Sequence, residues 1–89
     1  MKQVCKFLFD EDIESHLIET EIAQAILTAE DVFGQPKVRL SASYLVSKNK
    51  AVIDVTDEVG EHIARIFTGR MSRKVGHEPF SVDRINSKD

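Results

Sequence analysis

The chain has 89 residues, of which 42% are hydrophobic and 30% are charged, and its net charge is −3. This length fits one domain, and the composition is that of a globular protein rather than of an intrinsically disordered chain. The single cysteine, Cys5, excludes an internal disulfide and favours a reducing compartment, so we expect a cytoplasmic protein. No stretch approaches the roughly 20 apolar residues that cross a bilayer, and we expect no membrane partner.

The first expected elements are a strand and a helix. Residues 3–9 are rich in aromatic and branched side chains and predict a strand with Cys5, Phe7 and Phe9 on one face. Asp10 or Asp12 is positioned to cap the helix that follows, over residues 13–33. At 100° per residue, one sector of about 120° collects the expected core stripe of this helix. The stripe consists of Ile18, Ile22, Ala25, Ile26, Ala29, Val32 and Phe33.

A hairpin should come next. Residues 38–46 alternate between apolar and polar side chains, which is typical of a strand with one solvent-exposed face. Residues 47–50 form a polar turn in which Asn49 can adopt a positive φ, and residues 51–55 return as a second strand.

A second helix follows from Thr56 or Asp57. Gly76 is the preferred end of this helix, and Gly69 is the alternative. Pro79 then opens a last strand with Phe80 and Val82 directed inward, and residues 86–89 are expected to be a flexible tail.

This order predicts an α+β fold of the ferredoxin-like type over residues 1–85. A four-stranded antiparallel sheet would carry both helices on one face, with the first and third strands central. The other face would combine polar side chains with Val4, Leu8, Leu45 and Val52. Domains of this architecture often bind a partner through that face, which is an argument from fold alone.

Uncovered apolar side chains are the main functional signal. Ile13, Leu17 and Leu27 lie together on the side of the first helix opposite its core stripe. Either they contact a partner, or loops and the sheet edge cover Ile13 and Leu17. With Leu45 and Val52 of the open face, they form the expected interface of a small oligomeric module that binds a second copy or another protein.

Nucleic-acid or phosphate binding is the alternative function. Its candidate residues are Lys48, Lys50, Arg70, Arg73 and Lys74. The last three are cations near the end of the second helix, where they could simply complement its dipole. A sheet of this kind that binds RNA usually stacks bases on aromatic side chains of its central strands, and residues 50–55 contain none.

Enzymatic and metal chemistry has little support. Asp12, His16 and Glu19 share one side of the first helix, but such groups arise easily as surface ion pairs. Cys5 lies in an expected core strand without a feature that would lower its pKa. We therefore expect no catalytic residue, no metal and no cofactor.

Overall fold

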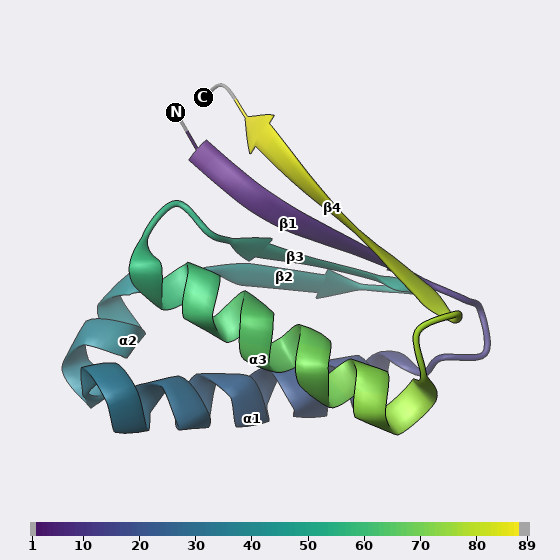
Figure 1. The fold of residues 1–89 in the computed structure, drawn as a ribbon, viewed down its shortest axis with the longest axis horizontal. Helices are drawn as coiled ribbons and strands as arrows, with labels where there is room; N and C mark the ends of the chain where they lie inside the picture. Colours follow the sequence, from purple (N-terminus) through teal and green to yellow (C-terminus); the bar gives the residue numbers. More distant parts are fainter. Residues whose placement is uncertain (1, 88–89) are drawn as a thin grey trace.

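The computed structural model describes residues 2–87 of the chain. In this part it is a mixed α/β fold with an open four-stranded antiparallel sheet and three helices (Figure 1). The elements in chain order are β1 (Lys2–Phe9), α1 (Ser15–Phe33), α2 (Gln35–Ser41), β2 (Tyr44–Ser47), β3 (Lys50–Asp54), α3 (Glu58–Val75) and β4 (Phe80–Ser87).

The sheet has the strand order β2-β3-β1-β4, so β3 and β1 are central and β2 and β4 form the edges. Cys5 lies opposite Ile53 of β3 on one side and opposite Arg84 of β4 on the other. Because side chains alternate along a strand, this register places Cys5, Phe7 and Phe9 on the same face. All three are buried, as predicted.

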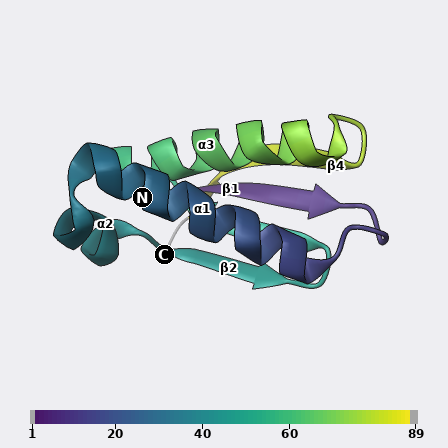
Figure 2. The same cartoon turned by 90° about the horizontal axis from the view of Figure 1, so that it is seen from below.

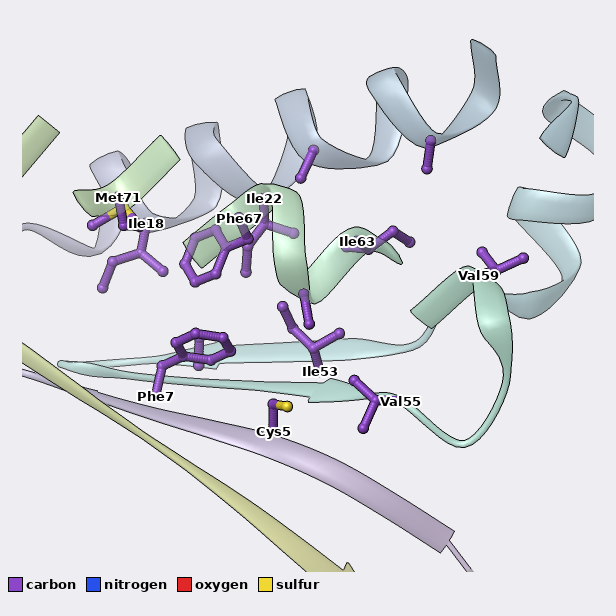
Figure 3. Packing of buried hydrophobic residues seen from close by; sticks show 14 of the residues in the cluster. Cys5, Phe7, Ile18, Ile22, Ile53, Val55, Val59, Ile63, Phe67 and Met71 are labelled. Atoms are coloured by element: carbon purple, nitrogen blue, oxygen red, sulfur yellow. The ribbon is translucent and has the colours of Figure 1, made fainter. Parts of the chain in front are cut away.

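Two long helices cover that face. Figure 2 shows α1 and α3 side by side over the sheet, with α2 at one end of the layer. The core between the helices and the sheet is close-packed: the ring of Phe67 on α3 meets Phe7 edge-on, with ring centroids 4.9 Å apart, and Ile18, Ile22 and Met71 surround this pair (Figure 3).

None of the helices within residues 2–87 combines the length and the apolar character that a membrane span requires.

Most of the predicted core stripe of α1 is buried, with one correction. Ile18, Ile22, Ala25 and Ala29 are buried, but Val32 is 60% exposed. Val32 lies in the last turn of α1, beside Gly34, where the chain turns away into α2.

The prediction of a strand over residues 38–43 is wrong. Gly34 has a φ of 89° and ends α1, and a new helix starts immediately with Pro36 in its first turn. The apolar residues of this segment also fit a helical period, because Val38 and Ala42 are four residues apart. Val38 is buried, whereas Leu40 is 89% exposed. Strand β2 is therefore only four residues long and begins at Tyr44.

The helix ends were predicted with mixed success. Asp57 caps α3 by accepting a hydrogen bond from the Gly60 amide at 3.0 Å, and the helix reaches Gly76, as expected. Neither Asp10 nor Asp12 caps α1, which starts later, at Ser15, after a turn. Strand β4 includes residues 86 and 87 of the expected tail, and residues 88 and 89 lie outside the described part.

The hairpin turn at residues 47–50 is confirmed. Asn49 has a φ of 62°, and its side-chain amide donates a hydrogen bond to the carbonyl oxygen of Asp10 at 2.7 Å. The turn is thereby joined to the segment that leaves β1.

Candidate functional site

The sheet face opposite the helices is uncovered within the described residues. The strand register brings Leu45, Val52, Lys6 and Asp83 into one row across all four strands. The rows on either side continue this mixture of apolar and polar groups. The apolar side chains of the open face are Val4, Leu8, Leu45, Val52 and Ile85.

Charges of both signs accompany these apolar groups. Lys50 and Asp54 flank Val52 on β3, Lys6 and Asp83 are neighbours on β1 and β4, and Lys2 starts β1. Burial raises the pKa of Asp54, but hydrogen bonds from Thr56 and the nearby Lys2 outweigh it and leave the pKa lowered. The open face therefore carries charged groups in near balance.

A shallow hollow lies on this face and extends from the start of β2 across the end of β3 to the first residues of β1. Its volume is about 220 Å³, and Leu45 and Val52 both contribute to its wall. The other lining residues are Lys2, Val4, Ser43, Tyr44 and Asp54.

The structure separates the five predicted interface residues into two groups. Leu45 and Val52 are cross-strand partners on the open face, and Leu45 is 66% exposed. Ile13 precedes α1 rather than lying on it, and both Ile13 and Leu17 are partly buried against the core. Leu27 alone of the helical group is largely exposed. Ile13 and Leu17 are therefore partly covered by the core of their own chain.

The five predicted basic residues are also divided. Arg70 donates from Nε to Oε1 of Glu21 at 2.6 Å, and Nζ of Lys74 lies 4.0 Å from Oε2 of the same carboxylate. Together with Arg73, these residues line a hollow of about 190 Å³. Lys48 and Lys50 belong to the hairpin instead and do not line this hollow.

Glu21 is the residue that the sequence reasoning missed. It is only 2% exposed, on the face of α1 that meets α3. A signal was present, because Glu21 is three residues after Ile18 and four before Ala25, which places it on the flank of the core stripe. Arg70 therefore lies against a buried carboxylate.

A second missed feature is a groove between α3 and β4. It has a volume of about 360 Å³. Glu61 on α3 holds two guanidinium groups there: Nη2 of Arg84 lies 2.7 Å from Oε2, and Nε of Arg65 lies 3.5 Å from the same oxygen. The lining residues are Cys5, Glu61, Ala64, Arg65, Thr68, Val82 and Arg84.

Among residues 2–87, no three His, Cys, Asp or Glu side chains are arranged to hold a metal ion. His62 packs edge-on against the ring of Phe33 at 5.4 Å. Burial raises the pKa of the Cys5 thiol, although Arg84 opposes this shift, so the thiolate is disfavoured.

Comparisons with protein-family models, with curated proteins and with solved structures gave no significant match. The function proposed below therefore rests on the geometry and chemistry of the described residues.

Proposed function

We propose that this protein is a small, non-enzymatic binding module that associates with a second copy of itself through the open sheet face. The observation that carries the proposal is the five apolar side chains on a face that no helix of residues 2–87 covers. Apolar groups gathered on one surface are typical of a contact with another protein.

The pattern of charge supports a second copy as the partner. If two faces meet with their strands running in opposite directions, Val52 lies against Val52 and Lys50 lies against Asp54 of the second copy. Lys6 and Asp83 share the row of Val52, so in this arrangement each lies opposite its own counterpart and diagonal to the opposite charge of the other copy. The pairing of Lys50 with Asp54 on both sides of the apolar Val52 contact is the complementarity that favours this partner and this register.

The size of the face implies weak association. Four strands about 4.8 Å apart and about five residues long give a face of roughly 15–20 Å in each direction. Two such faces would bury on the order of 800 Å² in total, less than the roughly 1,200–2,000 Å² of stable interfaces. We therefore expect a dimer with a Kd of about 10–1,000 μM, whose population depends on protein concentration.

We also propose that the fold is ferredoxin-like, with α2 as an addition between α1 and β2, and that the protein is cytoplasmic. The central position of β1 and β3 supports the first point. The single cysteine, which is buried and unpaired, supports the second.

Nucleic-acid or phosphate binding through Lys48, Lys50, Arg70, Arg73 and Lys74 remains the alternative proposal. Its support is weaker, because Arg70 and Lys74 lie against Glu21 and because the open face presents no phenylalanine from β1. A salt-dependent affinity for RNA that falls in Arg73→Ala would favour this alternative.

Sedimentation velocity over a concentration series tests the proposed function. We expect the weight-average mass to rise from that of one chain at about 10 μM toward that of two chains near 1 mM. A mass that stays at one chain throughout this range would contradict self-association.

A further inference from the structure

The groove between α3 and β4 has a physical cause in the strand order. Strand β4 is an edge strand, and Figure 1 shows that it runs away from α3 toward the C-terminus. At its start, Phe80 packs against Phe9 with ring centroids 5.4 Å apart, so the layer is filled there. Farther along, the facing side chains are the short Cys5 and Ala64, and Val82 is left partly exposed. A hollow with an apolar floor results.

The polar rim of the groove is held in place by one carboxylate. Arg84 donates to Glu61 from Nη2 and to the side-chain oxygen of Gln3 from Nη1 at 3.4 Å. Arg65, one turn along α3 from Glu61, approaches the same carboxylate. Each guanidinium has five N–H donors, and the contacts within residues 2–87 use one or two on each group. Donors for a further acceptor are therefore present on both guanidinium groups.

The charge of the rim is constant near neutral pH. The hydrogen bond from Arg84 lowers the pKa of Glu61, and the same bond raises the pKa of Arg84. Glu61 and Arg84 are therefore both ionised at pH 7. Together with the guanidinium of Arg65, they make two cations against one anion, which leaves a single net positive charge. This charge lies beside the apolar floor of Cys5, Ala64 and Val82.

We propose that this groove binds a small organic monoanion: a carboxylate attached to a short aliphatic or aromatic body. The carboxylate accepts hydrogen bonds from Arg84 and Arg65, and the apolar body lies on Ala64 and Val82. The volume of about 360 Å³ is at the lower end of the range for small-molecule sites. A dianion such as a phosphate monoester suits the groove less well, because Glu61 leaves only one unbalanced positive charge.

The groove is independent of the proposed self-association. Arg84 and Val82 alternate along β4 with Asp83, which faces the open side, so the groove and the open face lie on opposite sides of the sheet. Each proposal can therefore fail without the other.

The test is a titration of the full chain with hexanoate, followed by amide chemical shifts. We expect saturable shifts at residues 61–68 and 82–84, with a Kd on the order of 1–10 mM, as befits a ligand of about eight non-hydrogen atoms. Acetate carries the charge without the apolar body, and hexanol carries the body without the charge. Each should bind at least about tenfold more weakly than hexanoate.

Variants separate the two halves of the site. Arg84→Gln removes one of the two cations and Val82→Ser removes one apolar side chain of the floor, and each should weaken hexanoate binding by about three- to tenfold. Arg39→Gln is the matched control, because Arg39 is also exposed and also pairs with a glutamate, Glu30, at 3.6 Å. Its hexanoate affinity should be unchanged. The proposal would be overturned by the absence of saturable shifts, by shifts confined to other residues, or by equal binding of hexanol and hexanoate.

Discussion

Arg70 of α3 and Glu21 of α1 form a short ion pair, 2.6 Å between Nε and Oε1, at the contact between the two long helices. The glutamate is almost fully buried, whereas the arginine side chain keeps 30% of its surface in contact with solvent. Burying a carboxylate is costly unless a cation compensates it, so this pair makes the packing of α1 on α3 depend on Arg70.

Arg70→Met should therefore destabilise the protein by about 2–3 kcal/mol, because it leaves Glu21 with only Lys74 at 4.0 Å. The double variant Glu21→Leu with Arg70→Met removes both charges and should recover most of this loss. Urea denaturation of the two variants and the wild type measures the difference. Equal stability of Arg70→Met and the wild type would contradict the role given to the pair.

The ion pair of Glu61 with Arg84 predicts a pH dependence. The Arg84 hydrogen bond lowers the folded-state pKa of Glu61 below its unfolded value, so the contribution of Glu61 is fully present above the unfolded pKa. It is lost as the pH falls through the folded pKa. Glu61→Gln should cost about 0.5–1 kcal/mol at pH 7, and this difference should vanish in strong acid. Urea denaturation of both proteins from pH 7 to pH 2 tests this, and a difference independent of pH would contradict it.

Two glycines of α3 should respond in opposite directions to alanine. A Cβ at Gly60 would lie 1.8 Å from the carbonyl oxygen of Asp54, so Gly60→Ala forces the start of α3 away from the end of β3. We expect a loss of about 3 kcal/mol or more. At Gly69, the nearest atom to a Cβ is Nη1 of Arg73 at 3.6 Å, and Gly69→Ala should stabilise the helix by about 0.5–1 kcal/mol. Thermal unfolding of both variants gives the two signs directly, and the same sign for both would be the contrary result.

Two exposed leucines distinguish the open face from the helix layer. Leu45→Asp places a charge on the open face and should abolish self-association, whereas Leu40→Asp on α2 should leave it unchanged. Both side chains are largely in solvent, so neither variant should change the stability of the single chain by more than about 0.5 kcal/mol. Sedimentation velocity at matched concentrations reports the masses, and a dimer that persists in Leu45→Asp would exclude this face as the contact.

Much of the architecture follows from local patterns in the sequence. The apolar pattern repeats with a period of two along β1 and with a period of 3.6 along α1 and α3, over enough residues to identify those elements. Asp57 and Gly76 mark the two ends of α3, as their chemistry predicts. The segment around Val38 and Leu40 is different. Its alternation fits either a strand or one turn of helix, and only the position of Gly34 and the burial of Val38 against the core decide between them.

The candidate sites depend on pairings that no local pattern contains. Leu45 and Val52 could be assigned to one open face because both follow from the hairpin. The groove could not be predicted, since Arg84 reaches Glu61 only through the register of β4 on β1. The pairing of Arg70 with Glu21 likewise depends on how α1 and α3 lie side by side. The two residues are 49 positions apart in the chain, so no local pattern contains this pair.

Two copies of the chain are proposed to meet through their open sheet faces. The most direct test is an isotope-filtered nuclear Overhauser experiment on a concentrated mixture of labelled and unlabelled chains, which detects only contacts between copies. We predict contacts among the methyl groups of Val4, Leu8, Leu45, Val52 and Ile85. Intermolecular contacts from Leu27 or Leu40 in their place, or none at a concentration where the mass shows a dimer, would contradict the claim.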